Sequence, residues 1–285
     1  MEVKEKEPIL HENKDNILGE KVENKDKLVG PYEKVKLARD AERPRALDFI
    51  ENLFDDIVFL RGDRCFGDSK SILGGIASFK GIPITFIGIQ KGSGMEEALE
   101  TDFGMPKPEG YRKAIRLMEQ ADKFKRPVVT FVDTPGAYPG IDAEERGVFQ
   151  AIAEILATGS KVGVPIISFI IGEGGSGGAL ALAVANRLYM LENSVFSILS
   201  PEGFASILWK DSALASKAAN LMKLTSEDLL KGKIIDDIIW ELDKEKIGGI
   251  AGIETALERD LHELKKKNRN LLKKERFEKY RKIGV

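Results

Sequence analysis

The sequence predicts one α/β domain whose strands are buried. With 285 residues, of which 42% are hydrophobic, the chain is long enough for one large core with polar additions at its ends. From Leu73 onward, short β-prone apolar runs alternate with segments of helical periodicity, which is typical of an α/β fold. Two of the runs lead directly into glycines, and open α/β sheets bind ligands where their strands end. Function is therefore expected at these glycines.

The two ends of the chain differ in composition from its middle. Residues 1–38 mix Lys, Glu, Asp and Asn with few large apolar groups, so they cannot bury enough surface to offset the entropy of ordering. We expect them to form a polar N-terminal arm. After residue 248, leucines recur at helical spacing among many charges, which predicts that residues 249–285 form one charged amphipathic helix with a solvated basic face. The domain itself is expected to span residues 39–248.

The strands and helices of the domain follow from the spacing of apolar residues. Four runs predict buried strands: IASF, ITFIGI, VVTFVD and VPIISFII, at residues 76–79, 84–89, 128–133 and 164–171. Two segments, 108–125 and 143–158, repeat apolar residues every three or four positions. Because this is the period of a helix with one face on the core, we expect two such helices between the strands.

Charge, cysteine content and hydropathy exclude several classes of protein. The 44 basic and 46 acidic side chains give a net charge of -2, so no global positive field attracts nucleic acid or acidic lipid. The single cysteine, Cys65, cannot form an internal disulfide or a zinc-finger ligand set. No apolar run reaches the ~18 residues of a membrane span, and the N-terminus is charged where a signal peptide is apolar. We expect a cytoplasmic protein that does not enter the membrane.

The first glycine segment is VDTPGAYPG, residues 132–140. Its prolines and glycines impose a turn directly after a strand. The turn is expected to leave the N–H groups of Gly136, Ala137 and Tyr138 free to face a ligand. Taken alone, the segment is equally consistent with a purely structural turn.

The second glycine segment is IIGEGGSGGALALAVA, residues 170–185, in which glycines open a helix. The first N–H groups of a helix have no intrahelical acceptor, and the helix dipole places partial positive charge there. Missing Cβ atoms also let a ligand oxygen approach the backbone. The segment therefore predicts an oxyanion hole, in which each donor contributes roughly 2.7–4 kcal/mol to transition-state stabilisation. The alternative is that these glycines serve only the close packing of helix and strand.

Other catalytic chemistries lack residues that they need. Residues 174–178 read G-x-S-x-G, which would make Ser176 the nucleophile of a serine hydrolase. Such an enzyme needs a histidine, and the two present, His11 and His262, lie in the polar arm and in the charged C-terminal segment. The sequence has no G-x-x-x-x-G-K-[ST] phosphate loop, which disfavours ATP chemistry. Because histidine is so scarce, we also expect no metal on this chain.

With these residues considered, the chain resembles the α-subunit family of bacterial acetyl-CoA carboxylase carboxyltransferases over residues 39–240. The resemblance rests on five segments: GDRCFGD (62–68), FGMPKPEGYRKAIRLM (103–118), DTPGAYPGIDAEERG (133–147), IGEGGSGGALAL (171–182) and SPEGFASILWK (200–210). It implies an α/β crotonase-like fold of the ClpP/crotonase superfamily, which is a spiral of strand-strand-helix repeats. It also implies transfer of a carboxyl group from carboxybiotin to acetyl-CoA, giving malonyl-CoA for fatty acid synthesis.

The resemblance implies several partners. In this family a homologous β subunit supplies the facing half of each active site, so the chain is expected to be active only with that subunit, in a heterotetramer of two α and two β subunits. The zinc ribbon of the enzyme belongs to the β subunit, which agrees with a single cysteine here. Biotin is carried covalently by a separate biotin carboxyl carrier protein, and biotin carboxylase is a further partner.

The resemblance places one pair of oxyanion donors at Gly177 and Gly178, which should hold the ureido oxygen of biotin. The β subunit's own glycine pair would then stabilise the enolate of acetyl-CoA, while the biotin nitrogen takes the methyl proton. No side-chain base is required. This agrees with a sequence that offers glycine-rich helix starts but no convincing histidine, cysteine or paired-carboxylate site.

Further binding residues are expected around this pair. Gly174 and Gly175 precede it and should contribute to the binding of biotin or substrate. The turn Gly136-Ala137-Tyr138 should line the same pocket. Tyr138 is expected to pack against the flat biotin bicycle, with a place in the core as the alternative.

Lys91, in the segment QKGSG (90–94), is a further candidate. It follows a strand end and is expected to meet a carboxylate or phosphate group, although a solvated turn is the simpler alternative. The family usually carries more basic residues after this Lys-Gly pair, whereas this chain has Gly94-Met95-Glu96-Glu97. Contacts made by those basic residues are therefore not carried over. No CoA-binding residue is assigned, because no phosphate motif marks one.

Two other functions remain open at this point. The first is carboxyl transfer to another acyl-CoA, such as propionyl-CoA, because the glycines of this chain would handle biotin in the same way. Competing-substrate kinetics would decide between the two acceptors. The second is a non-enzymatic interaction protein, in which the charged ends dock partners and the glycines serve only packing.

Overall fold

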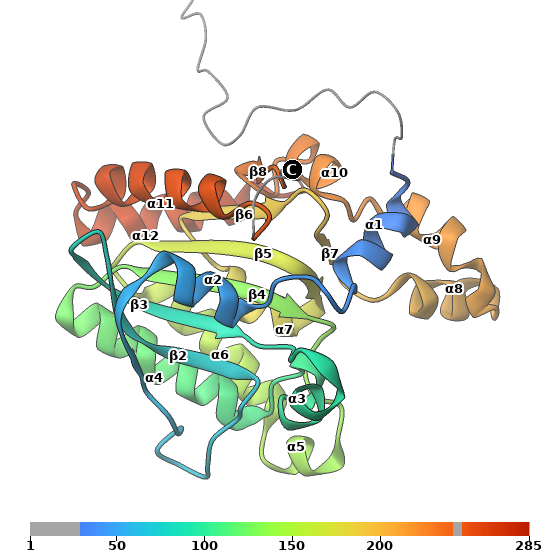
Figure 1. Ribbon diagram of the computed structural model, residues 1–285, viewed down its shortest axis with the longest axis horizontal. Coiled ribbons are helices and arrows are strands. Elements are labelled where there is room, and N and C mark those ends of the chain that lie inside the picture. The colour runs from blue at the N-terminus through green and yellow to red at the C-terminus, as the bar shows by residue number, and fades with distance from the viewer. Residues whose placement is uncertain (1–28, 242–246, 285) are drawn as a thin grey trace, which may run out of the picture.

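The computed structural model describes residues 29–241 and 247–284, which are built around one sheet. The described residues form an eight-stranded sheet in the order β1-β2-β3-β4-β5-β6-β8, with β7 paired to the end of β5 (Figure 1). The pairs β1–β2 and β2–β3 are antiparallel, and the others are parallel. The strands are β1 (Asp55–Phe59), β2 (Ile72–Phe79), β3 (Ile82–Ile89), β4 (Val128–Thr134), β5 (Ile166–Gly175), β6 (Arg187–Leu191), β7 (Val195–Ser197) and β8 (Asp237–Ile239).

Helices cover both faces of the sheet (Figure 1). On one face lie α4, α6 and α7, and on the other α2 and α11. α8 and α9 project from the body beside α1. The helices are α1 (Pro31–Ala38), α2 (Ala46–Leu53), α3 (Gly94–Glu100), α4 (Pro108–Phe124), α5 (Ile141–Glu145), α6 (Val148–Lys161), α7 (Ser176–Ala183), α8 (Pro201–Trp209), α9 (Ala215–Met222), α10 (Ser226–Lys231), α11 (Ile250–Leu264) and α12 (Arg269–Arg281). None of the helices in the described ranges is long and apolar enough to cross a bilayer.

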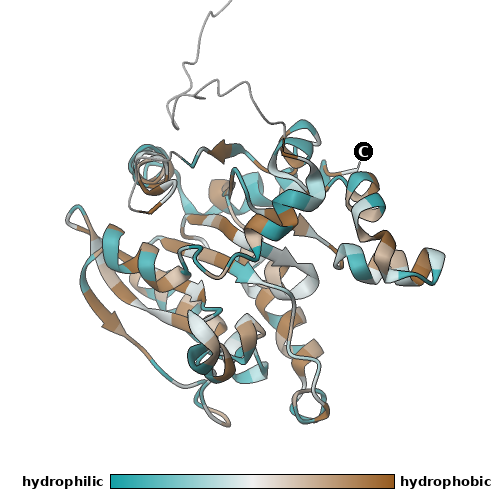
Figure 2. Cartoon of the chain, turned by 45° about the vertical axis from the view of Figure 1, so that its right-hand side comes forward, coloured by the Kyte–Doolittle hydropathy of each residue, from teal (hydrophilic) through white to brown (hydrophobic). Residues whose placement is uncertain are grey.

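Side chains of the central strands alternate between two cores, as the two-residue period of a strand requires. In β4, Val128 and Val132 join the core under α4, α6 and α7, whereas Val129 and Phe131 join the core under α2 and α11. Figure 2 shows hydrophobic segments in the strands of the sheet and in the helices around it. The four strands expected from the apolar runs coincide with β2, β3, β4 and β5, so that prediction is confirmed.

Of the two predicted helices, one is confirmed and the other is wrong in extent. The helix expected at 108–125 is α4, which begins at Pro108 and ends where Lys125 turns left-handed with φ of 58°. The helix expected at 143–158 is divided into α5 and α6. Gly147 lies between them with φ of 80°, a conformation that glycine adopts at little cost and that no α-helix continues through.

The ends of the chain also differ from expectation. Residues 249–285 do not form the single helix predicted, because α11 ends at Leu264 and α12 begins after Asn268. The Asn268 side chain accepts the N–H of Leu271 at 3.0 Å and so caps a new helix. Within the predicted arm, residues 31–38 form α1, and residues 1–28 lie outside the described residues. The domain boundaries themselves stay predictions.

The basic face of α12 is only partly solvated, because Arg276 and Tyr280 lie against the domain. Arg276 is 1% exposed. Its guanidinium donates to one side-chain oxygen and three backbone carbonyls, at 2.5–3.0 Å: those of Asn186, Gly159, Val162 and Val164. The Tyr280 hydroxyl donates to the Ala183 carbonyl at 2.5 Å and accepts the Ala185 N–H at 2.9 Å. α12 therefore closes the C-terminal end of α7.

The loop between β1 and β2 is organised by one carboxylate, that of Asp63. Its Oδ1 accepts three backbone N–H groups at 2.8–2.9 Å, those of Cys65, Phe66 and Gly67. Its Oδ2 accepts Arg112 Nε at 2.8 Å. Burial alone would raise the pKa of Asp63, but these bonds to the charged form outweigh it and lower the pKa to about 2.

We expect Asp63 to make the protein acid-sensitive. Because the pKa is lower in the folded chain than the ordinary 3.8, this carboxylate stabilises the fold fully above about pH 4, and its contribution is lost as pH falls toward 2. At neutral pH the contribution is about 2 kcal/mol, from 1.36 kcal/mol per pKa unit. Urea unfolding of wild type and Asp63→Asn between pH 7 and pH 2 checks this. The difference between the two should shrink as pH falls, and a difference that is constant with pH would contradict the assignment.

Candidate active site

The glycine run of residues 170–185 begins in a strand and ends in a helix. Gly174 and Gly175 are the last residues of β5, where they pair with Phe196 and Ser197 of β7. α7 then starts at Ser176, which makes the sharp turn with φ of 49°. This strand-to-helix turn presents the start of α7 at the carboxyl end of the parallel strands, where open α/β sheets bind ligands.

The turn after β4 packs directly on the start of α7. A Cβ added to Gly178 would lie 2.7 Å from the carbonyl carbon of Gly136 and 2.9 Å from the nitrogen of Ala137. A Cβ added to Gly175 would lie 2.1 Å from the carbonyl oxygen of Pro135. The two glycine segments that the sequence singled out are therefore in contact. At Gly175 and Gly178, close packing is itself sufficient reason for a glycine.

Gly177 differs from its neighbours, because packing does not require a glycine there. Within 4 Å, a Cβ at this position would meet only Cγ2 of Ile152, at 3.6 Å, which is an ordinary van der Waals contact. In a helix the Cα–Cβ bond tilts toward the N-terminus. A side chain at Gly177 would therefore lie beside the open end of the helix. The glycine keeps this approach to the backbone clear.

The first N–H groups of α7 have no side-chain cap. Gly177 and Gly178 lie in the first turn, where a backbone N–H has no intrahelical acceptor. Two such donors on adjacent residues, at the positive end of a helix dipole, can bind one oxygen that carries or gains negative charge.

In the turn after β4, the expectation of three free N–H groups is corrected to one. The Gly136 N–H donates to Oγ1 of Thr134 at 3.0 Å, and the Tyr138 N–H donates to the Pro106 carbonyl at 3.2 Å. Of these three N–H groups, only that of Ala137 has no acceptor among the described residues. The turn is thus held by its own hydrogen bonds and places at most one donor beside α7.

Tyr138 is half-buried beside this turn, at the edge of the core under α4 and α6. The Lys107 ammonium lies 4.5 Å from the centre of its ring. The ring also covers Gly140, where an added Cβ would lie 2.3 Å from Cε1 of the tyrosine. Stacking of Tyr138 on biotin stays a prediction, and it requires a ring face that these two neighbours do not cover.

Lys91 lies just beyond β3, and its ammonium is bound to a carboxylate of the chain itself. Its Nζ is 2.5 Å from Oε2 of Glu173 and 3.7 Å from Oδ1 of Asp133, and its side chain is largely buried. The alternative of a solvated turn is therefore excluded for this side chain. Contact of Lys91 with a ligand carboxylate or phosphate stays a prediction.

Glu173 precedes the glycines in β5 and lies at the centre of a charged cluster. Its Oε1 accepts Nε of Arg39 at 2.7 Å, while Oε2 accepts Lys91. Burial alone would raise the pKa of Glu173, but the charges of Lys91 and Arg39 hold it below its usual value. Arg39 also bonds Glu202, in the first turn of α8, at 2.9 Å.

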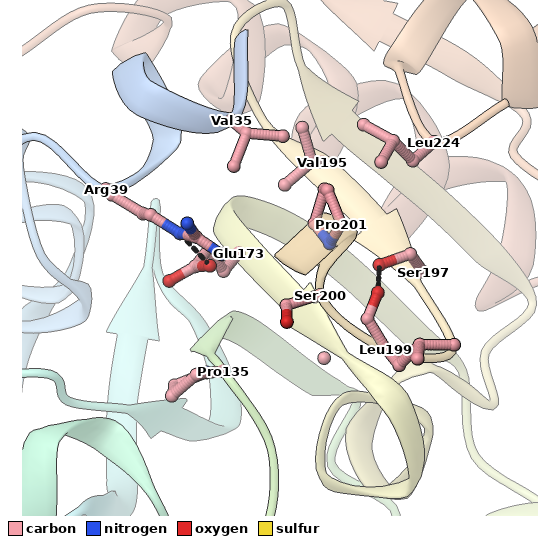
Figure 3. Close-up of a pocket in the computed structure, with 12 residues that line it drawn as sticks. Val35, Arg39, Pro135, Glu173, Val195, Ser197, Leu199, Ser200, Pro201 and Leu224 are labelled. Carbon is pink, nitrogen blue, oxygen red and sulfur yellow. Dashed lines mark hydrogen bonds and ion pairs between the residues drawn. The ribbon is translucent and has the colours of Figure 1, made fainter. Parts of the chain in front are cut away.

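A small pocket opens between this cluster and the end of β5 (Figure 3). Arg39 and Glu173 point toward each other at one side of it, and Val35, Val195 and Leu224 form an apolar wall. The backbone of Gly174 and Gly175 contributes to its lining. The pocket therefore places an ion pair next to the strand end that leads into α7.

Hydrolase and metal chemistry find no support at this site. Ser176 sits in the sharp turn that a nucleophile elbow requires. However, His262 is in the last turn of α11, which packs on the opposite face of the sheet from α7, and His11 lies outside the described residues. In the described parts of the chain, no three His, Cys, Asp or Glu side chains gather as metal ligands would. The expectation that this chain carries no metal stays a prediction.

Comparison with known proteins decides the family. Residues 3–284 match the model of the family described as acetyl co-enzyme A carboxylase carboxyltransferase-like. The chain belongs to this carboxyltransferase family. The family predicted from the five sequence segments is therefore confirmed.

Curated members of the carboxyltransferase family are similar over most of the chain. The acetyl-coenzyme A carboxylase carboxyl transferase subunit alpha of Clostridium botulinum (strain Eklund 17B / Type B) is 53% identical over 263 residues, which cover 90% of this chain and 94% of that protein. A protein of Natranaerobius thermophilus named subunits beta/alpha is 54% identical over 269 residues, 93% of this chain. This chain spans 44% of the length of that protein.

Solved structures of carboxyltransferases share the fold of this family member. A transcarboxylase 12S structure matches with a TM-score of 0.68 at 19% identity, over 80% of this chain and 43% of that chain. The beta subunit of geranyl-CoA carboxylase from P. aeruginosa matches with a TM-score of 0.63 at 14% identity, over 85% of this chain and 46% of that chain. The predicted crotonase-like α/β fold is confirmed.

Sequence reasoning missed the charged cluster under the glycines of this carboxyltransferase. Glu173 interrupts the apolar run of β5 immediately before Gly174. A carboxylate in a buried strand needs a cation or several hydrogen-bond donors, so Glu173 in the sequence already indicated that a cationic or donor side chain lies beside it. Of its partners, Lys91 was a candidate from the sequence for contact with a carboxylate, whereas Arg39 comes from a distant segment and carried no comparable signal.

Proposed function

We propose that this chain forms the α half of the active site of an acetyl-CoA carboxylase carboxyltransferase, which moves a carboxyl group from carboxybiotin to acetyl-CoA in the cytoplasm. The observation that carries the proposal is the start of α7. Gly177 and Gly178 offer adjacent uncapped N–H groups, and the space in front of Gly177 is open although packing would admit a side chain. Such an arrangement suits an oxygen that gains charge during reaction.

The residues at the start of α7 fit the ureido group of biotin carried by a separate protein. When bound, carboxybiotin supplies the carboxyl group. The Gly177 and Gly178 N–H groups donate to the ureido oxygen and stabilise the charge that develops there as the carboxyl group leaves. The Ala137 N–H, beside Gly178, is available as a further donor to the same ligand.

Proton transfer need not involve a side chain of this cluster. Lys91 and Glu173, the titratable groups beneath the glycines, are bonded to each other at 2.5 Å. The second carboxylate oxygen of Glu173 accepts Arg39. Neither residue is free to act as a general base in this arrangement. We therefore assign this chain the binding of biotin and the stabilisation of charge, and leave the methyl proton to biotin and the partner subunit.

The surface around α7 supports a protein partner, which we identify as the β subunit. Ile141 of α5 and Phe149 of α6 are 76% and 71% exposed on one side of the strand ends. On the other side, Ile198, Ile207 and Leu208 are more than half exposed on and before the projecting α8. Figure 1 shows α5 below α7 and α8 to its right. Exposed apolar groups that border a polar site indicate a protein interface.

Reconstitution tests the proposed function. We expect malonyl-CoA to form from acetyl-CoA and carboxylated carrier protein only when this chain and a β subunit of the family are both present. Each subunit alone should give no product. Full activity of this chain alone would overturn the shared site. A folded complex without product, in the presence of active carrier, would overturn the proposed reaction, and propionyl-CoA serves as a second acceptor in the same assay.

Phe149 should matter for assembly rather than for the fold of the chain. Phe149 lies one helical turn from Ile152, the neighbour of Gly177, so a partner that covers the site is expected to cover it too. Phe149→Asp should weaken β-subunit binding at least tenfold, about 1.4 kcal/mol, because it buries a charge in the interface. Titration calorimetry measures the affinity. Phe277→Asp, at a 62% exposed position on α12, is the matched control and should bind normally.

A further inference from the structure

We propose that Glu173 is a positioning residue for the oxyanion donors of α7. Its carboxylate, held between Arg39 and Lys91, fixes the end of β5 from which Gly174 and Gly175 lead into the helix. The inference rests on the proposed function and extends it to a residue that touches no substrate.

The charged cluster ties the end of β5 to three other elements. Arg39 ends α1, Lys91 follows β3, and Asp133 belongs to β4. Asp133 accepts the Glu173 N–H at 3.0 Å through Oδ1 and Arg45 at 2.9 Å through Oδ2. Both the backbone and the side chain of Glu173 are therefore held, and from different directions.

Burial makes this arrangement rigid. The side chains of Asp133 and Glu173 are 1% and 11% exposed, and that of Lys91 is 15% exposed. Each carboxylate oxygen of Glu173 has its own cation; the Arg39 side chain is 35% exposed, but a shift of the strand end that separates Glu173 from Lys91 would break a largely buried pair. Separating a buried pair is costly, because water is not there to solvate either charge.

The position of Glu173 in the chain connects this rigidity to the site. Only Gly174, Gly175 and Ser176 separate it from Gly177. Gly174 and Gly175 have no side chains to anchor them, so their position depends on backbone pairing with β7 and on the residues before and after them. On the far side, Gly175 is held by contact with Pro135. Oxyanion donors must lie within about 0.5 Å of their working position, and Glu173 is the nearest residue before them whose side chain is anchored by ion pairs.

Substitution of the carboxylate by an amide tests this inference with little change in shape. Glu173→Gln can accept from only one of the two cations, because the second oxygen becomes an NH2 group that faces a cation. In the reconstituted complex we expect kcat to fall roughly ten- to hundredfold, the range for a small misplacement of catalytic groups. KM for the carrier and for acetyl-CoA should not change. Glu227→Gln, which removes a carboxylate bonded to Lys34 of α1 away from the glycines, is the control and should leave kcat unchanged, although the Glu227 side chain is more exposed, at 49%.

A double-mutant cycle separates positioning from a general loss of stability. If Glu173 acts through Lys91, the two substitutions should not be independent. The fold-loss of kcat in the variant that combines Glu173→Gln with Lys91→Met should then be clearly smaller than the product of the two single fold-losses. Three results would each overturn the proposal: a fold-loss of kcat in the double variant that equals the product of the single losses, an unchanged kcat in Glu173→Gln, or an equal loss of kcat in Glu227→Gln. A raised KM with unchanged kcat in Lys91→Met would also overturn the proposal, because Lys91 would then bind substrate and not position Glu173.

Hydrogen exchange distinguishes failure of this inference from failure of the proposed function. In the full chain without partners, Glu173→Gln should speed amide exchange in a peptide that covers residues 174–183, and the control Glu227→Gln should not. This readout requires no turnover. If wild-type complex makes no malonyl-CoA but the exchange difference is present, the reaction is wrong and the positioning holds. If exchange is equal in all three proteins, the positioning is wrong.

Discussion

Gly177→Val should abolish most of the activity while leaving the fold intact. The valine Cβ fits beside Ile152 at an ordinary distance, and its branches extend toward the open end of α7, where the N–H groups of Gly177 and Gly178 face the ligand. Blocking one oxyanion donor typically costs 10²- to 10³-fold in kcat. Malonyl-CoA formation by the reconstituted complex measures the loss, and circular dichroism of the chain measures the fold.

The control for this substitution is a glycine of similar freedom away from the site. Gly30, before α1, has φ of -67° and no atom near its added Cβ, so Gly30→Val should fold and turn over normally. Gly178→Ala is a poorer test than Gly177→Val, because its methyl would meet the backbone of Gly136 and displace the turn. Normal turnover by a folded Gly177→Val complex would show that these glycines serve packing alone.

Arg276→Met should destabilise the chain more than any surface substitution on α12. The guanidinium satisfies three buried carbonyls and the Asn186 side chain, and methionine of similar length satisfies none. Leaving buried acceptors without donors costs about 1–3 kcal/mol each, and we expect a net loss of about 3–5 kcal/mol in the free energy of unfolding. Urea unfolding followed by circular dichroism checks this.

Lys274→Met is the matched control for the arginine substitution. Lys274 lies on the same helix, but its side chain is 70% exposed and its ion pair with Glu278 is long, at 3.8 Å. Its loss should change stability by no more than about 0.5 kcal/mol. Equal losses in the two variants would show that α12 contributes through helix content and not through the buried arginine.

The central strands and the site-bearing glycines could be predicted from the sequence, because both depend on local patterns. β4 and β5 are continuous apolar runs, and such runs in an α/β chain are buried parallel strands. The glycines at 174–178 follow one of them directly, which placed the helix start at the strand end. The shared pocket of the start of α7 and the turn at Gly136 was implied by the family resemblance, and the contact between them agrees with it, since adjacent parallel strands end at one edge.

What could not be predicted depends on contacts between distant residues. In the sequence, Arg276 cannot be distinguished from the other cations of a basic segment. Its burial follows from hydrogen bonds to carbonyls near the end of α6 and just before β5, which are distant in the chain. The break between α11 and α12 rests on one capping asparagine among charges, without a change in apolar period. The N–H groups of Gly136 and Tyr138 looked free because their acceptors, Thr134 and Pro106, depend on the conformation of the turn.

The order in which the chain is synthesised gives the α12 contacts a further consequence. α12 is made after β5, α6 and α7, whose ends it closes through Arg276 and Tyr280. A nascent chain on the ribosome folds from its N-terminal side, so the helix that carries Gly177 is present before its C-terminal lock exists. The contacts that hold the C-terminal end of α7 can therefore form only after α12 has left the ribosome.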